Sequence, residues 1–211
     1  MIIIGVDEAG YGAIAGPLVV AAVAYHDEAE MPHIEAWKRI YVQDSKKLKP
    51  EYLEALAVKI KQTAMIYEVI TVPGMQVDAL GGANEAKLYN LALVIKRVVE
   101  RLRTIYYDVP YKRRIIVDGH ATLSVPFEYE QIPKADGTVW QVGAASILAK
   151  VTQLNEMAEL HEKYPRYAFK QNKGYPTADH IERLQKYGPC KQHRRSTRSL
   201  APWRKKPKGR E

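Results

Sequence analysis

With 211 residues, 46% of them hydrophobic, the chain is long enough to bury one substantial core. Its longest apolar stretch, Pro17 to Tyr25, is far shorter than the roughly 20 residues that cross a bilayer, so the sequence predicts no membrane span. A single cysteine, Cys190, excludes an internal disulfide framework and a cysteine-based zinc cluster. We therefore expect a cytoplasmic protein without a membrane contact.

The net charge of +8 is concentrated near the C-terminus. Nine basic residues and one acid follow Cys190, whereas the preceding part of the chain carries equal numbers of acidic and basic side chains. A basic segment on a neutral body offers a salt-dependent contact to a polyanion. We expect residues 198–211 to be a basic, disordered tail that follows one domain over residues 1–197.

In chain order, the predicted elements interleave strands and helices. They are strands over 2–6 and 18–25, a short helix around Trp37, a helix over 51–62, a strand over 65–72, a helix over 84–103, strands over 114–117 and 127–133, a helix beginning near 143, and a last helix from Thr177 as its N-cap to about Tyr187. The basic side chains of the helix over 84–103, Lys87, Lys96, Arg97 and Arg101, are expected to be solvated. The absence of a repeat and of a linker before the tail predicts a single α/β domain.

The first predicted strand is followed by two acids and a glycine-rich loop. The β-branched run stops at Asp7 and Glu8. Adjacent strand residues point to opposite faces, so both acids serve one site only if the strand bends or ends there, which Gly10 and Gly12 permit. The bare backbone N–H groups of such a loop suit a phosphate or a sugar hydroxyl. The alternative is that the two acids cap a turn on a solvated rim.

Two further acids share this context. Asp118 follows the predicted strand over 114–117, Asp136 follows the strand over 127–133, and both adjoin a glycine. Ligand sites of α/β sheets form at such strand ends, and an all-oxygen set of carboxylates favours Mg²⁺ or Mn²⁺ over zinc. Two such ions can activate a water and stabilise the leaving oxygen in phosphodiester cleavage. The alternative is that these strand-end acids belong to ordinary turns.

Seven short blocks, in this order, resemble the ribonuclease HII family over nearly the whole chain. They are GVDEAGYG from Gly5, DSKKL from Asp44, VDG from Val117, KAD from Lys134, AASILAKVT from Ala144, NKGYPT from Asn172 and HRRS from His193. The resemblance implies a ribonuclease H-like α/β fold, a mixed β-sheet flanked by helices, with a helical C-terminal portion.

The activity that the resemblance implies is endonucleolytic. Such an enzyme hydrolyses the RNA strand of RNA·DNA hybrids, cuts at ribonucleotides embedded in duplex DNA, and leaves 3′-hydroxyl and 5′-phosphate ends by catalysis with two divalent ions, Mg²⁺ or Mn²⁺. We expect a monomer with a role in DNA replication and repair.

The resemblance also implies roles for particular residues. The four metal-binding, catalytic acids of the family correspond to Asp7, Glu8, Asp118 and Asp136. The loop whose amides address the 2′-hydroxyl corresponds to Gly10, Tyr11 and Gly12, and the aromatic ring that stacks on the following sugar corresponds to Tyr175. Five basic residues in matching blocks are expected to touch phosphates or to tether substrate-facing loops: Lys46, Lys47, Lys150, Arg194 and Arg195.

The chain departs from the family pattern at Tyr11, where an arginine is usual. We therefore expect an active enzyme whose handling of ribonucleotide–DNA junctions is altered. Two other functions compete with this interpretation: a DNA nuclease of the same fold, similar to resolvases or integrases, and a non-catalytic module that binds RNA·DNA hybrids. Dependence of cleavage on a divalent metal separates the second of these from an enzyme.

Overall fold

The computed structural model describes residues 1–27, 50–107 and 109–203. Its strands and α-helices are β1 (Ile2–Ala9), β2 (Leu18–His26), α2 (Pro50–Thr63), β3 (Ile66–Val72), α3 (Gly74–Ala79), α4 (Ala83–Ile105), β4 (Arg113–Asp118), β5 (Glu130–Ile132), α5 (Trp140–Lys163), α6 (Phe169–Asn172) and α7 (Ala178–Tyr187). The 3₁₀ helices are η3 (Ala135–Gly137), η4 (Pro165–Tyr167) and η5 (Arg198–Trp203). None of the helices in these ranges has the length and apolar composition to cross a membrane.

The contacts of the chain divide it into two compact units, where the sequence predicted one domain. Unit 1 comprises Met1–Ala9, Val19–Thr71 and Lys87–Gln153, and unit 2 comprises Gly10–Leu18, Val72–Ala86 and Leu154–Glu211. Each unit is described by itself below. The predicted helix around Trp37 lies outside the described residues.

Unit 1 is built on a mixed five-stranded sheet of order β3-β2-β1-β4-β5. β1 pairs antiparallel with β2 and parallel with β4, and β4 pairs parallel with β5. The antiparallel pairing continues to Ala9 opposite Val19, whereas the parallel pairing ends at Val6 opposite Val117. The prediction that the first strand ends at Asp7 is therefore wrong, because β2 still supplies hydrogen-bonding partners to β1 beyond the point where β4 stops.

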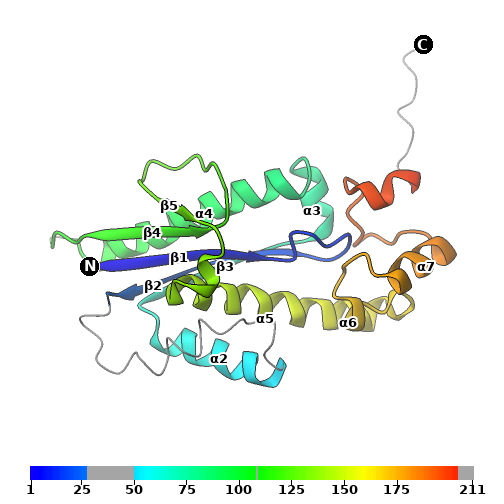
Figure 1. Ribbon diagram of the computed structural model, residues 1–211, viewed down its shortest axis with the longest axis horizontal. Helices are drawn as coiled ribbons and strands as arrows, with labels where there is room; N and C mark the ends of the chain where they lie inside the picture. The colour runs from blue at the N-terminus through cyan, green and yellow to red at the C-terminus, as the bar shows by residue number, and fades with distance from the viewer. Residues whose placement is uncertain (28–49, 108, 204–211) are drawn as a thin grey trace, which may run out of the picture. The chain divides into compact units, whose positions relative to one another are not determined.

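Helices cover both faces of this sheet, as Figure 1 shows. On one face α4 contributes Leu91, Val94, Ile95, Val98 and Leu102 to a core with Ile2, Ile4 and Val6. On the other face α2 and α5 pack against Val19, Ala21 and Val23. The second face needs a glycine in β1, since a Cβ at Gly5 would lie 2.2 Å from the backbone carbonyl carbon of Gln141 at the start of α5. This close approach of strand and helix fixes α5 against the strand that carries Asp7 and Glu8.

Unit 2 consists of loops and short helices around two small cores. One core joins Ala15 to Met157, Leu160, Tyr167 and Phe169. The other joins Ile14 to Leu184 and Leu200. Thr177 caps α7 as predicted, with its hydroxyl accepting from the His180 N–H at 3.2 Å.

The first residues of the predicted disordered tail are ordered. Residues 198–203 form η5 rather than a disordered segment, because Leu200 is buried against Ile14 and Leu184. The predicted strand over 127–133 is likewise shorter, with only Glu130–Ile132 in β5. The Tyr129 hydroxyl accepts from the Leu123 N–H at 2.8 Å, and this contact folds the preceding segment back as a loop. Regular structure therefore ends where a side chain takes over the backbone hydrogen bonds.

Candidate active site

The four predicted acids all belong to unit 1. Asp7 and Glu8 lie near the end of β1, Asp118 is the last residue of β4, and Asp136 lies in η3. β1 and β4 are parallel neighbours, so their carboxyl ends lie at the same edge of the sheet. Both acids of β1 follow the last residue that pairs with β4, which leaves this edge of the strand open beside Asp118.

Asp7 is the most enclosed of these carboxylates, with 5% of its surface exposed. Burial raises its pKa well above the usual range, and the neighbouring charges of Glu8 and Asp118 raise it further. Two hydrogen bonds act in the opposite direction, one from Ser146 of α5 and one from the Glu8 N–H to Oδ1 at 2.7 Å. Ser146 was not among the predicted site residues, because nothing in the local sequence of this helix marks it as a partner of Asp7.

Glu8 shares this environment but has a cation beside it. Burial raises its pKa, the ammonium of Lys87 lowers it, and the charge of Asp118 raises it again. The Lys87 Nζ lies 3.3 Å from Glu8 Oε1, and both side chains are largely covered, with 12% and 15% of their surfaces exposed. The prediction that Lys87 is solvated is therefore wrong. Arg101 of the same helix is also paired, with its Nη1 at 2.6 Å from Glu68 Oε1.

A hydrogen bond links Asp118 to the turn that carries Asp136. Asp118 Oδ1 accepts from the Ala135 N–H at 2.6 Å. Lys134 adopts a left-handed conformation, with φ of 59°, and turns the chain into η3 directly before Ala135. Asp118 therefore fixes the start of the turn on which Asp136 is carried.

The donor set suits a divalent cation by its chemistry. The charges of Glu8 and Asp118 raise the pKa of Asp7, and the charge of Asp118 raises the pKa of Glu8. Carboxylate oxygens are the preferred ligands of Mg²⁺ and Mn²⁺. In residues 1–27, 50–107 and 109–203, no three His, Cys, Asp or Glu side chains are close enough to hold one ion as they stand. The ammonium of Lys87 provides positive charge at Glu8.

The glycine-rich loop after β1 belongs to unit 2. It turns back at Gly10, where φ is +77° and the carbonyl accepts from the Ala13 N–H at 3.2 Å. The Ile14 and Ala15 N–H groups then donate to the Gly174 carbonyl at 2.8 and 3.2 Å. A Cβ at Gly174 would lie 2.1 Å from the Ala15 oxygen, so only glycine permits this contact. The loop is thereby joined to the segment that contains Tyr175.

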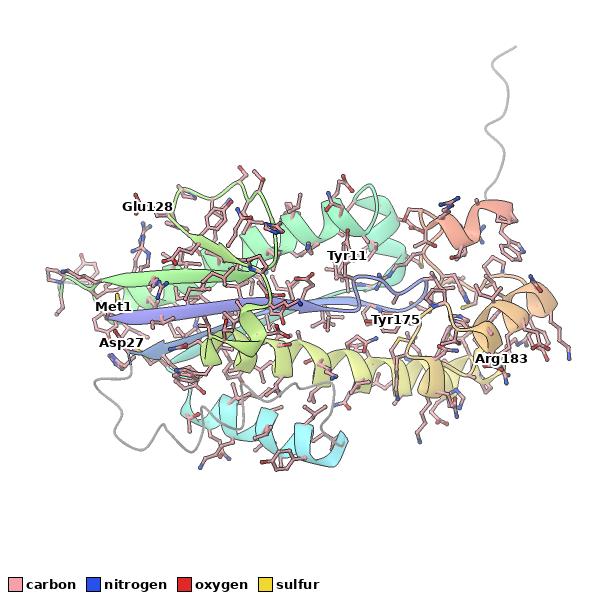
Figure 2. The ribbon with its side chains drawn as sticks, viewed as in Figure 1. Met1, Tyr11, Asp27, Glu128, Tyr175 and Arg183 are labelled. Carbon is pink, nitrogen blue, oxygen red and sulfur yellow. The ribbon has the colours of Figure 1, made fainter. Side chains whose placement is uncertain are left out.

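Two exposed tyrosines lie on the glycine-rich loop and on the segment joined to it, and both are labelled in Figure 2. Tyr11 on the glycine-rich loop is 43% exposed, and Tyr175 is 41% exposed. A Cβ at Gly12 would lie 3.7 Å from Tyr175 Cε1, so the ring borders the loop backbone without excluding a small side chain. The structure thus places Gly12 beside the ring of Tyr175.

Two buried histidines hold the backbone of Tyr175. The His193 Nδ1 accepts from the Cys190 N–H at 3.0 Å, so the proton of a neutral His193 is on Nε2. That nitrogen lies 3.2 Å from His180 Nε2, and the His180 Nδ1 donates to the Tyr175 carbonyl at 2.8 Å. Burial lowers the pKa of both rings, to about 4 for His193, where the neighbouring His180 lowers it further. No local sequence pattern marks these two histidines, since their pairing depends on the folding of unit 2.

The predicted basic residues have three different placements. Arg194 is completely buried, and its guanidinium donates to backbone carbonyls of the glycine-rich loop, so it tethers the loop and is not an exposed phosphate ligand. Arg195 is exposed, and its Nη1 donates to the Trp203 carbonyl at 3.1 Å. Lys150 is half-buried on α5. Lys46 and Lys47 lie outside the described residues.

Comparison with known proteins agrees with this architecture. The family model described as Ribonuclease HII matches residues 4–201. A Ribonuclease HII of Hydrogenovibrio crunogenus is 39% identical over 194 residues, which cover 92% of this chain and 84% of that protein. Among solved structures, the ribonuclease H2 from Pyrococcus horikoshii OT3 is similar with a TM-score of 0.71 and 27% identity, covering 96% of each chain.

A second structural neighbour is a complex with a metal. Bst-RNase HIII in complex with Mn²⁺ is similar with a TM-score of 0.69 and 25% identity, over 95% of this chain and 68% of that chain. The mixed sheet, the acids at its edge and these matches lead to one assignment: the chain belongs to the ribonuclease HII family, endonucleases that cut the RNA strand of RNA·DNA hybrids.

Proposed function

We propose that unit 1 carries the cleavage chemistry and that Asp7, Glu8, Asp118 and Asp136 hold the divalent ions for it. The observation that carries this proposal is the raised pKa of Asp7 and Glu8, since buried carboxylates that repel one another are stabilised by a cation. Bst-RNase HIII, the neighbour solved with Mn²⁺, supports a divalent ion. We propose Mg²⁺ or Mn²⁺, two ions during catalysis, and 3′-hydroxyl and 5′-phosphate products.

When bound, such ions supply Lewis acidity and lower the pKa of an attacking water. The residues of the chain provide what surrounds them. Asp7 is held by Ser146 and by the Glu8 N–H, which fix the direction of its carboxylate. Asp118 is held through Ala135, and Glu8 is free to exchange the Lys87 ammonium for a cation.

We propose further that the loop Gly10, Tyr11 and Gly12 together with Tyr175 recognises the ribose. A backbone N–H can hydrogen-bond to a 2′-hydroxyl, the group that distinguishes RNA from DNA, and an aromatic ring packed on the next sugar selects its shape. The exposure of both tyrosines beside this loop supports the assignment. Recognition of one ribose does not need a continuous RNA strand, so ribonucleotides embedded in duplex DNA are substrates too.

Lys150 and Arg195 are proposed to contact phosphates, together with Lys46 and Lys47. Phosphate contacts position a duplex without reading its sequence and weaken as salt rises. The protein is proposed to act as a monomer, in DNA replication and repair. The cytoplasm is its proposed compartment, which the single cysteine favours.

The test compares three matched duplexes of one sequence: a continuous RNA strand on DNA, a single ribonucleotide within DNA, and DNA alone. Each is incubated with the wild-type protein in Mg²⁺, in Mn²⁺ and in EDTA, with Asp118→Asn as the inactive control. We expect cleavage of the first two duplexes in both metals, none of the third, and none in EDTA. Cleavage of DNA alone would favour the DNA nuclease, and tight binding of the hybrid without cleavage would favour the binding module.

A further inference from the structure

Arg194 is the largest completely buried side chain of the described residues. Its backbone N–H donates to the Ile14 carbonyl at 2.8 Å, next to the isolated bridge between Ala15 and His193. A buried guanidinium is expensive to remove from water, and it is retained only where hydrogen bonds replace its hydration. The contacts of this side chain therefore indicate its purpose.

The guanidinium of Arg194 collects carbonyls of the glycine-rich loop. Its Nη1 donates to the carbonyls of Gly10 at 2.7 Å, Ala13 at 3.0 Å and Tyr11 at 3.2 Å. Its Nε donates to the Gly16 carbonyl at 3.0 Å. Its Nη2 is buried and has no hydrogen-bond partner among the described residues. One side chain thus holds four carbonyls within seven consecutive residues of the loop.

The geometry of the peptide bond makes this contact directional. In a planar trans peptide the C=O of one residue and the N–H of the next point in opposite directions. The peptide units whose carbonyls face Arg194 at Gly10 and Tyr11 carry the N–H groups of Tyr11 and Gly12. These two N–H groups consequently point away from the guanidinium. They belong to the residues that the proposed function assigns to the ribose.

We propose that Arg194 is a positioning residue for ribose recognition, which orients the Tyr11 and Gly12 amides by holding the carbonyls of the same peptide units. The inference rests on the proposed role of the loop. It assigns Arg194 no contact with substrate, because the side chain has no exposed surface. Burial lowers its pKa to about 10, so the guanidinium remains protonated and keeps all of its donors at neutral pH.

The test uses Arg194→Lys, which keeps the charge but offers no planar fork of donors. Binding is measured in the Asp118→Asn background with Mg²⁺, so that no substrate is cut. The readout is the ratio of the dissociation constants for all-DNA and single-ribonucleotide duplexes of one sequence. We expect Arg194→Lys to lower this ratio by about tenfold, as loss of one well-oriented hydrogen bond does, with the dissociation constant for DNA alone unchanged.

The control is Arg183→Lys, a substitution in unit 2 at an arginine that pairs with Asp179 on α7. We expect it to leave the ratio unchanged. If Arg194→Lys weakens binding of both duplexes equally, or leaves both unchanged, the proposal is overturned. A wild-type protein with no preference for the ribonucleotide duplex would instead contradict the proposed role of the loop, whatever the variants do.

A measurement on the wild-type protein covers the case in which Arg194→Lys does not fold. The guanidinium N–H signals of Arg194 are followed by NMR at neutral pH. A tether predicts slowly exchanging Nη signals that are present without nucleic acid and do not shift when all-DNA duplex is added. Rapid exchange in the free protein would show that Arg194 is not held as a tether, and a shift with all-DNA duplex would show that it responds to the nucleic acid; either result overturns the proposal.

Discussion

The two units bury opposite charges and satisfy them in different ways. Unit 1 encloses the acids Asp7 and Glu8, whose pKa is raised chiefly by burial, which outweighs the donors beside them. Unit 2 encloses Arg194 and two histidines, and burial lowers the pKa of all three. Arg194 and His180 donate to backbone carbonyls, and the Nε2 of His193 lies against His180. The difference supports the proposal that the acids bind an external cation, whereas the buried bases of unit 2 hold the fold of the loop.

The substitution Asp7→Asn should have the largest effect on this difference between the units. We expect cleavage to fall by about a thousandfold or more, because the substitution removes a proposed metal ligand worth several kcal/mol in the transition state. Without metal, we expect the variant to be more stable than the wild type, because a neutral amide removes the repulsion with Glu8 and Asp118. Each kcal/mol of added folding stability should raise the midpoint of thermal unfolding by about 2–4 °C.

The sign follows from linkage. When the pKa of a carboxyl is raised in the folded state, the protein loses folding stability as pH rises from the usual pKa to the raised one. The charged form of Asp7 therefore destabilises the folded protein. Glu130→Gln, at an exposed acid of β5 paired with Arg114, is the matched control and should change neither quantity appreciably. A lower unfolding midpoint for Asp7→Asn without metal would contradict the account of unit 1.

Acid affects unit 2 in the opposite direction. The pKa of His193 is lowered to about 4 from an ordinary value near 6.5, so folding stability is full above the ordinary value and is lost as pH falls toward 4. The loss amounts to about 3 kcal/mol when complete. Hydrogen exchange resolved by segment should show amides near Cys190 losing protection between pH 6.5 and 4.

His193→Gln removes the titrating group from that experiment. The variant should lose less protection over the same pH range, although its protection at pH 7 is lower than in the wild type because the contact with His180 is gone. Equal pH dependence in both proteins would mean that another group controls the acid response of unit 2.

The smallest expected effect is that of Lys87→Met. Because the Lys87 ammonium lies 3.3 Å from Glu8, it competes with a cation for that carboxylate. At pH 8 we expect Mn²⁺ to bind roughly twofold to fivefold more tightly to the variant, the range of a single ion pair. Lys96→Met on the same helix is the control. Weaker binding by Lys87→Met would mean that Lys87 holds Glu8 in place for the metal.

Much of unit 1 could be predicted from the sequence because its elements are long and periodic. The apolar runs of β1, β2 and β4 and the stripe of α4 specify a buried sheet and a covering helix, and the acids follow those runs directly. The continuation of β1 through Asp7 and Glu8 was not predictable, since it depends on pairing with β2. The pair of Lys87 and Glu8 joins residues 79 positions apart, a contact with no local pattern.

Unit 2 was predicted less well for a physical reason. Charged residues are exposed by default, so the sequence gives no sign that Arg194 is buried and holds Gly10, 184 positions away. The histidine pair and the packing of Leu200 depend in the same way on how short segments meet. The N-cap at Thr177 was predicted because a cap is a local feature.

The measurement that tests the central claim most directly is calorimetric titration of the wild-type protein with Mn²⁺ near neutral pH, in two buffers of different ionisation enthalpy. Because Asp7 and Glu8 have raised pKa values, we predict that binding releases protons to the buffer and that the heats differ accordingly. Asp7→Asn should release fewer protons and bind more weakly. Absence of Mn²⁺ binding, or binding that Asp7→Asn and Asp118→Asn leave unchanged, would contradict a metal-dependent carboxylate site in unit 1.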